Sequence, residues 1–262
     1  MQKLLRALKE VPLRDLPWRK TRDPYKILVS EIMLQQTQVE RVMPFYIRFI
    51  RQFPNARALS KAPLSKVLKA WQGLGYNRRA VCLQRSAKIL SEAKVSSRLP
   101  GVGPYTKAAV EAFAYNKPTI FIETNIRTVF LYYCFGRLDI SSHSVRKISD
   151  KEILPLVEKA LKKSGIEPRE FYARLMDLGT QLKRQGIKLN NKSVHYTKQS
   201  KFEGSYRQLR GQILRTVLEE PATLHRLIQV IARSRRDVVK TLASLSSEGV
   251  IKLKRNKFYI AG

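Results

Sequence analysis

Cysteine, histidine and acidic residues are scarce in this sequence of 262 residues. Its two cysteines, Cys82 and Cys134, are too few for a disulfide framework, a four-cysteine zinc site or a four-cysteine iron–sulfur cluster held by this chain alone. The three histidines are scattered without the spacing of metal ligands, so we expect no metal site built from side chains.

Long apolar runs are absent as well. No segment approaches the roughly 18 apolar residues that a membrane span needs. The first 16 residues carry charges throughout and lack the apolar core of a secretory signal. At 44% apolar residues, however, the chain can bury a sizeable core. We therefore expect a folded, cytoplasmic protein without a membrane partner.

Positive charge is abundant and unevenly distributed. The chain has 51 Lys and Arg against 20 Asp and Glu, a formal net charge of +31. Residues 41–91 contain eleven Lys or Arg and no acid, whereas an ordinary solvated surface mixes both signs. Nucleic acid is the favoured partner, because neutralising phosphates releases counterions. Non-specific association with other molecules, or adaptation to unusual cytoplasmic salt, is the alternative explanation of the charge.

Helical periodicity dominates the chain up to about residue 183. No alternating strand pattern precedes residue 249, and the polar, basic residues 184–204 are typical of a linker. The expected helices cover residues 2–10, 25–37, 40–52, 63–70, 78–92, 104–115, 124–134, 150–163 and 168–183.

Residues 205–262 have a different pattern. Three short helices are expected, the third over 235–247 after a Ser234 cap, followed by a two-stranded ribbon that turns at Arg255 and Asn256. This order is that of a winged helix-turn-helix module, which either contacts DNA or serves only for protein docking. DNA contact is favoured by cations on the third helix and the ribbon, namely Arg233, Arg235, Arg236, Lys252, Lys254, Arg255 and Lys257.

The segment LPGVGPYT at residues 99–106 opens a helix. Gly101 and Gly103 permit a tight turn whose backbone N–H groups can point at a phosphate from the start of the following helix. Two glycines alone would more often form an ordinary turn, but the whole string is typical of a helix–hairpin–helix, which grips the DNA backbone without reading its sequence.

Two further segments carry candidate functional side chains. Glu31 lies in an apolar helical pattern with no basic partner one turn away, so it is either a solvent-facing charge or a partly desolvated acid. Tyr76 ends a Gly-Leu-Gly-Tyr turn beside Arg78 and Arg79. Such a turn is either simply packed, or presents an aromatic ring that wedges into a duplex.

Five motifs together resemble the helix–hairpin–helix DNA glycosylases: SEIMLQQT (30–37), GLGYNRRA (73–80), LPGVGPYT, ETNIRTV (123–129) and MDLG (176–179). The similarity covers about residues 14–182 and is greatest to the MutY family, which removes adenine mispaired with 8-oxoguanine. It implies an all-α, two-lobed fold with a winged-helix-like module appended. The expected parts are a six-helix barrel (23–133), a second lobe (1–22 and 134–183), a basic linker replacing a cluster loop (184–204) and the module (205–262).

The resemblance also implies the chemistry. Cleaving an N-glycosidic bond takes a proton for the base and stabilisation of a cationic sugar, tasks for two carboxyl groups. Glu31 matches the family's purine-protonating glutamate, and Glu123 stands where the family has its catalytic aspartate. Asn125 matches the asparagine two residues further on. Tyr105 occupies the place of the Schiff-base lysine of bifunctional relatives, which implies a monofunctional enzyme that leaves an abasic site.

DNA contacts follow from the same resemblance. Gln36 and Thr37 match positions that probe the base stack and the opposing strand, and Tyr76 matches the intercalating tyrosine. Family members often hold a monovalent cation, K⁺ or Na⁺, on the hairpin backbone. Lys183 stands at the first cluster cysteine, so no iron–sulfur cluster is expected. The remaining expected DNA contacts are Arg78, Arg79, Gly101, Val102, Gly103, Thr106 and Arg127.

The expected partner is double-stranded DNA with a mismatch or an oxidised base, bound by a monomer. Two other functions remain open. Thymine-mismatch relatives also carry tyrosine at the Tyr105 position, so the enzyme could take thymine or uracil instead of adenine. A non-catalytic DNA-binding protein would keep the hairpin and the basic surface while Glu123 marks lost chemistry.

Overall fold

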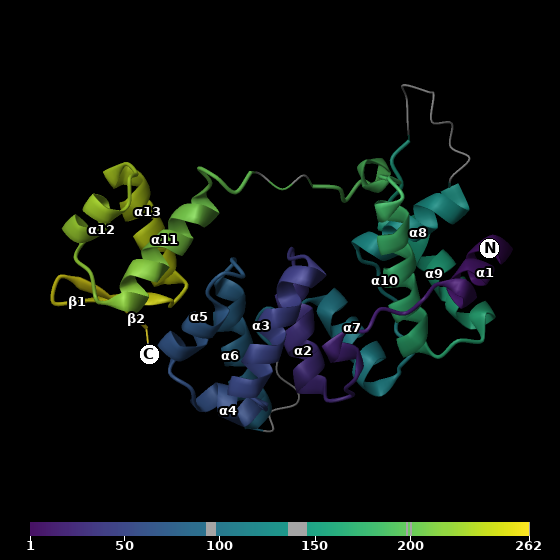
Figure 1. The fold of residues 1–262 in the computed structure, drawn as a ribbon, viewed down its shortest axis with the longest axis horizontal. Helices are drawn as coiled ribbons and strands as arrows, with labels where there is room; N and C mark the ends of the chain where they lie inside the picture. Colours follow the sequence, from purple (N-terminus) through teal and green to yellow (C-terminus); the bar gives the residue numbers. More distant parts are fainter. Residues whose placement is uncertain (93–97, 136–145, 198, 200, 262) are drawn as a thin grey trace. The chain divides into compact units, whose positions relative to one another are not determined.

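The computed structural model describes residues 1–92, 98–135, 146–197, 199 and 201–261. Its contacts divide the chain into two compact units (Figure 1). Unit 1 comprises residues 1–28 and 103–198, and unit 2 comprises residues 29–102 and 199–262. Helix α2 (Pro24–Leu34) begins in the first unit and ends in the second. In the described part of the chain, the regular structure is helical apart from one two-stranded ribbon.

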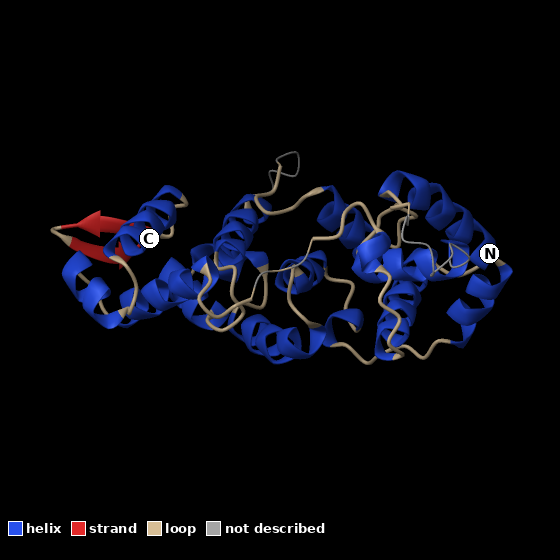
Figure 2. Cartoon of the chain, turned by 90° about the horizontal axis from the view of Figure 1, so that it is seen from above, coloured by secondary structure: helices blue, strands red, loops and turns tan. Residues whose placement is uncertain are grey.

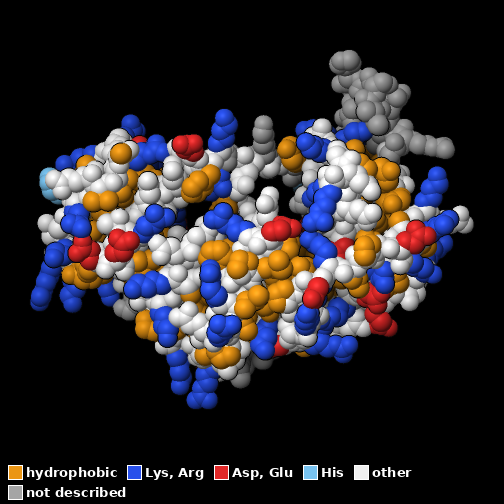
Figure 3. Space-filling view, viewed as in Figure 1, with side chains coloured by type: hydrophobic (Ala, Val, Ile, Leu, Met, Phe, Trp, Pro, Cys, Tyr) orange, Lys and Arg blue, Asp and Glu red, His pale blue; other side chains and the backbone are white. Residues whose placement is uncertain are grey.

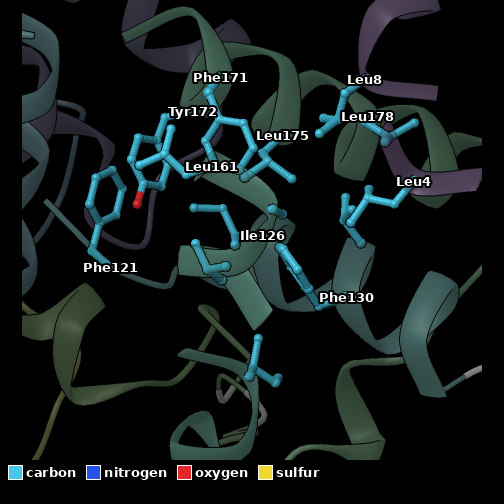
Figure 4. Close-up of a cluster of buried hydrophobic side chains, with 14 of the residues drawn as sticks. Leu4, Leu8, Phe121, Ile126, Phe130, Leu161, Phe171, Tyr172, Leu175 and Leu178 are labelled. Carbon is cyan, nitrogen blue, oxygen red and sulfur yellow. The ribbon is translucent and has the colours of Figure 1, made fainter. Parts of the chain in front are cut away.

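Unit 1 is built around α10, which packs along α8. Three further helices complete its core, with two short 3-10 turns in the connections. The elements are α1 (Gln2–Glu10), η1 (Pro17–Arg19), α7 (Pro104–Tyr115), α8 (Thr124–Phe135), α9 (Asp150–Ser164), α10 (Pro168–Arg184) and η2 (Asn190–Lys192). Large apolar side chains from α1, α8 and α10, such as Leu4, Phe130 and Phe171, meet fully buried at the centre (Figure 4). Burying each stabilises the fold by about 1.5–3 kcal/mol.

The N-terminal segment is tied to α10 by a buried carboxylate. Asp177, 4% exposed, accepts hydrogen bonds from the Arg14 amide (2.9 Å) and Arg14 Nε (2.5 Å) and from Arg19 Nη1 (2.6 Å) and Nη2 (3.0 Å). Burial opposes the ionised form, but the hydrogen bonds and charges of the two arginines prevail and hold the pKa of Asp177 below its ordinary value. Asp177 therefore acts as a structural link between distant parts of the sequence.

Replacing this link tests its contribution. We expect Asp177→Asn to lower the free energy of unfolding by about 3–5 kcal/mol, because two half-buried arginines lose their counter-charge. Since the pKa of Asp177 is depressed in the folded state, its stabilisation exists above about pH 4 and is lost as the pH falls through the folded pKa. Urea unfolding at several pH values measures both effects.

The matched control is Asp15→Asn, which removes a carboxylate paired with Lys20 at 2.8 Å on the exposed surface. That change should cost less than about 1 kcal/mol. Equal losses for the two variants would contradict the buried-link interpretation.

In unit 2, residues 29–102 form a helical layer around an aromatic core. Its helices after α2 are α3 (Val39–Gln52), α4 (Ala56–Lys61), α5 (Leu64–Trp71) and α6 (Arg78–Ser91). Phe49 and Trp71 are fully buried and meet edge to face, with ring centroids 5.8 Å apart. This packing supports the turn that follows Trp71, which carries the predicted DNA-contacting tyrosine.

The C-terminal module, residues 205–262, has the predicted winged helix-turn-helix order. Its elements are α11 (Tyr206–Glu219), α12 (Leu224–Val230), α13 (Arg235–Ser247), β1 (Ile251–Lys254) and β2 (Lys257–Ile260). The strands, red in Figure 2, pair antiparallel with Ile251 opposite Ile260, and Ala222 adds a bridge to Phe258. Ser205, Thr223 and Ser234 each cap their helix through the side-chain oxygen.

The helix predictions are confirmed with small shifts, but α4 was not predicted. The expected barrel at 23–133 stays a prediction, while the contacts place residues 103–133 in unit 1. The reason is the tight packing of α8 against α10, which draws residues 103–133 into unit 1. The first half of the expected linker is not free either: Ile148 donates from its amide to the Lys192 carbonyl (2.8 Å) and accepts from the Val194 amide (3.1 Å).

None of the helices in the described residues is long and apolar enough to cross a membrane. Lys and Arg side chains are spread over both units, with far fewer Asp and Glu among them (Figure 3).

Candidate active site and nucleic-acid interface

Glu31 lies inside the protein, on the second half of α2. Only 5% of the residue is exposed, and its neighbours Val29, Ser30, Ile32 and Met33 are completely buried. The solvent-facing alternative for Glu31 is therefore wrong. The carboxyl group of Glu31 is therefore removed from solvent, and its role as the proton donor stays a prediction.

Arg79 organises the chain around the end of α2. It is 9% exposed, and its guanidinium donates to the carbonyl oxygens of Ile32 (3.0 Å), Met33 (2.8 Å) and Gln35 (2.5 Å) and to those of Leu74 (3.3 Å) and Gly75 (3.1 Å). Burial lowers the pKa of Arg79 to about 10. The two Nη groups of Arg79 thus hold together the loop after α2 and the loop before α6, while its buried Nε has no hydrogen-bond partner in the described residues. A direct DNA contact at Arg79 stays a prediction, and its burial does not favour it.

Those two loops present other predicted DNA-contacting residues. Gln36 adopts a left-handed backbone (φ 55°), which turns the chain after α2 and leaves Gln36 exposed and Thr37 partly exposed. In the second loop, Gly73 (φ 106°) must be glycine, because an added Cβ would lie 2.9 Å from the Phe45 ring. Arg78 is exposed at the start of α6, in a position to meet a phosphate.

Tyr76 has partners that the sequence did not indicate. The guanidinium groups of Arg79 and Arg207 lie over its ring, 5.4 Å and 5.3 Å from the ring centroid. The Tyr76 hydroxyl accepts hydrogen bonds from Arg207 Nη1 (2.8 Å) and from the Gln199 amide. The C-terminal module therefore contacts the predicted intercalating tyrosine directly, through the first turn of α11.

The hairpin 99–106 is tightly built. Gly101 (φ 75°) has no room for a side chain, since a Cβ would come within 2.8 Å of Cys82 Cβ. Gly103 precedes α7 with Pro104 at its first position, and no side chain caps this helix end. The backbone N–H groups there remain suited to a phosphate. Val102 is partly exposed, whereas Thr106 is 2% exposed, so its side chain belongs to the core and only its backbone fits the predicted DNA contact.

Glu123 lies at the start of α8 in unit 1. Its Oε1 accepts hydrogen bonds from the amides of Asn125 (2.7 Å) and Ile126 (3.0 Å), and its Oε2 accepts from Asn125 Nδ2 (3.3 Å). Glu123 therefore caps the N-terminus of α8. A carboxylate at a helix N-terminus also interacts favourably with the helix dipole.

Asn125 is held in turn by Lys183, whose Nζ donates to Asn125 Oδ1 at 2.6 Å. Burial, against the opposing influence of Glu123, lowers the pKa of Lys183 below its ordinary value. An ammonium group so engaged does not fit an iron–sulfur ligand. Among the described residues, no three His, Cys, Asp or Glu side chains form a group able to hold a metal ion.

Two other predicted site residues, Tyr105 and Arg127, also lie in unit 1. Tyr105 is partly buried and packs edge to face on Phe121, with ring centroids 5.6 Å apart. Arg127 forms a bidentate ion pair with Asp150, both N–O distances being 2.8 Å. The guanidinium group of Arg127 is thus engaged with α9 and its side chain is only 12% exposed. The DNA contact at Arg127 stays a prediction that this pairing does not favour.

The MDLG motif brings α10 against the cluster at Gly179. A Cβ at Gly179 would lie 2.5 Å from the Asn125 carbonyl oxygen and 2.6 Å from Asn125 Cβ. We expect Gly179→Ala to displace Asn125, lowering the free energy of unfolding by about 1–3 kcal/mol and reducing catalysis at least about tenfold. Chemical unfolding and single-turnover kinetics measure the two effects.

Gly211→Ala serves as the matched control, since Gly211 also lies inside a helix but has open space around its Cβ position. There the change should leave stability unchanged or raise it by up to about 1 kcal/mol. A Gly179→Ala protein as stable and active as the control would refute the close-packing argument.

The hairpin before α7, the buried Glu31 and the helix-capping Glu123 are the features expected of a helix–hairpin–helix DNA-repair protein. Residues 29–155 match the HhH-GPD superfamily of base excision DNA repair proteins. A solved structure described as a thermostable thymine-DNA glycosylase is similar with a TM-score of 0.56 at 26% identity, covering 74% of this chain and 94% of the other.

Curated relatives narrow the family. An adenine DNA glycosylase of Mycolicibacterium smegmatis is 32% identical over 95% of this chain and 92% of its own length. One from Mycobacterium tuberculosis is 38% identical over 63% of this chain and 56% of its own length. One from Buchnera aphidicola is 38% identical over 53% of this chain and 42% of its own length. The chain therefore spans about half the length of these last two relatives. The chain belongs to the HhH-GPD superfamily and, within it, to the adenine DNA glycosylase family.

Proposed function

We propose that this chain is a monofunctional DNA glycosylase that binds double-stranded DNA and excises adenine opposite 8-oxoguanine or guanine, leaving an abasic site. The burial of Glu31 in an apolar helix carries the proposal. The names of the relatives support the choice of adenine, and the hairpin and the basic surface support duplex DNA as the partner.

The reaction divides into a protonation and a hydration. Glu31 delivers its proton to a ring nitrogen of the adenine, which turns the base into a neutral leaving group as the C1′–N bond breaks. The resulting cation at C1′ is captured by a water oxygen, and the proton released from that water restores Glu31.

Glu123 stabilises the cationic sugar in this proposal. Its charge is oriented by the amides of Asn125 and Ile126 and by the Asn125 side chain, which Lys183 holds from the other side. A preoriented charge needs no rearrangement as the cation forms. The glutamate carries one methylene more than the family aspartate, a shift of about 1.5 Å, so these contacts would have to place the longer side chain correctly.

Tyr105 supports hydrolysis without strand cleavage. A phenol cannot form the Schiff base through which bifunctional relatives open the sugar, and its packing on Phe121 keeps the ring in place. K⁺ or Na⁺ on the hairpin carbonyls, a monomeric state and a cytoplasmic location complete the proposal.

A substrate panel tests the function. Oligonucleotide duplexes with adenine opposite 8-oxoguanine, G, C or T are incubated under single-turnover conditions, and abasic sites are revealed by alkali. We expect adenine to be released from the mispairs with 8-oxoguanine and with guanine. Without alkali the DNA strands should stay intact. No abasic sites from any adenine mispair would overturn the adenine assignment.

Thymine or uracil opposite G is the second candidate substrate, favoured by the fold similarity to a thymine-DNA glycosylase. Both are included in the same panel. Release of thymine or uracil alone would select this candidate. Tight binding to mispaired duplexes without release of any base would leave a non-catalytic DNA-binding protein.

A further inference from the structure

The C-terminal module turns one side of α13 away from its own core. Val238, Leu242 and Leu245 are buried inside the module. On the opposite side, the N-terminal half of the helix exposes cationic and apolar side chains, namely Arg235, Arg236, Val239 and Lys240. This is the part of a winged module that reaches a DNA groove in the general geometry of such folds.

The ribbon after α13 exposes further cationic side chains. Arg255 (φ 44°) and Asn256 (φ 58°) form its tight turn in left-handed conformation, and the residues from Lys252 to Lys257 are all exposed. Four of these six residues are cationic. We call the seven cations the α13–wing surface: Arg235, Arg236, Lys240, Lys252, Lys254, Arg255 and Lys257.

Most acidic residues of the C-terminal module lie outside the α13–wing surface, and two of them form ion pairs within the module. Glu248 forms a bidentate ion pair with Arg210, with N–O distances of 2.9 and 2.7 Å, and Glu220 pairs with Arg226. Asp237, in the first turn of α13, interacts with its cap Ser234. A surface with seven exposed cations and a single acid repels itself, so an anionic partner would stabilise it.

The module is also fixed to the rest of unit 2. Arg207 donates to the Tyr76 hydroxyl at 2.8 Å, and Arg85 Nη2 donates to the Glu248 carbonyl at 3.1 Å. A second binding surface that is held close to a first one adds affinity, because its own contact then becomes intramolecular.

We infer that the α13–wing surface is a second contact for duplex DNA, which grips the phosphate backbone outside the segment where a base is excised. It depends on the proposed function only in taking duplex DNA as the partner. The cations bind phosphates through charge, so the contact adds affinity on long duplexes whatever their sequence.

The test compares two variants with equal charge loss. The wing variant carries Lys254→Ala, Arg255→Ala and Lys257→Ala, and the control carries Lys151→Ala, Lys159→Ala and Lys163→Ala on the exposed side of α9. Affinity for fully paired duplexes of about 12 and about 40 base pairs, roughly one and four helical turns, is measured by fluorescence anisotropy over a range of salt concentrations. Circular dichroism verifies that both variants are folded.

On the long duplex we expect the wing variant to bind about tenfold more weakly than the wild type. Its slope of log affinity against log salt should fall by about 2, reflecting lost phosphate contacts. On the short duplex it should match the wild type, and the control should stay within about twofold of the wild type on both.

Wild-type affinity and slope of the wing variant on the long duplex would overturn the inference and leave the module as a protein-docking unit. An equal loss in the control would do so as well, since it would reduce the effect to net charge. Arg235→Ala with Arg236→Ala gives a second, independent variant, with the same expected direction. All measurements use DNA without a mispair, so they stand apart from the glycosylase panel.

Discussion

Glu31→Gln is expected to abolish base release while leaving DNA binding within a few-fold of the wild type. Glutamine has nearly the same shape and fits the buried position on α2, where Glu31 is 5% exposed, but it has no proton to give. Loss of a general acid costs about 10²–10⁴ in rate. The measurement is the single-turnover rate of abasic-site formation on the preferred mispair, together with the dissociation constant for the same duplex.

Glu40→Gln is the matched control for this prediction. Glu40 is exposed in the first turn of α3, nine positions from Glu31, and its replacement should leave the rate within about twofold, as for most surface positions. A Glu31→Gln protein that retains near-full activity would refute the assignment of Glu31 as the acid.

Glu123→Gln separates the two roles of this side chain. The glutamine oxygen can still accept the amides of Asn125 and Ile126, so we expect the cap and the stability of α8 to be kept. The negative charge is lost, and the rate should fall by about 10²–10³, as when a preoriented electrostatic group is removed. Single-turnover kinetics and urea unfolding of the same protein give both quantities.

Glu123→Asp provides the comparison. It keeps the charge but withdraws it by about 1.5 Å, so its rate should lie between those of the wild type and Glu123→Gln. If Glu123→Gln retained wild-type activity, the side chain would be a helix cap alone and the cationic sugar would need another stabiliser.

Much of the fold could be predicted from local signals. The helices at 104–115 and 235–247 agree with α7 and α13 at both ends, because a proline start and a serine cap are short-range features. The turn at Arg255 and Asn256 was equally local. In contrast, α4 spans only Ala56–Lys61, less than two helical turns, which is too short for the periodicity of apolar residues to stand out.

The sequence indicated which residues belong to the candidate site, but not their contacts or their burial. Motifs identified Glu31, Tyr76, Glu123 and Asn125, but not what each of them touches. Arg78 and Arg79 are adjacent in the sequence, yet the first is exposed and the second is buried among backbone carbonyls. No local signal distinguishes them, because the partners of Arg79 lie up to 47 positions away.

The sequence by itself predicted nucleic acid as the partner, and it determined the helical architecture and the positions of the two carboxyl groups in the chain. Its excess of positive charge, the apolar periodicity and the glycine-rich hairpin are properties of composition and of near neighbours in the chain. The tertiary structure decided the environment of each side chain: Glu31 is buried, Arg127 pairs with Asp150, and Tyr76 contacts two arginines. Burial and pairing arise where distant segments pack together, and that packing sets the solvation and the charge environment of each group.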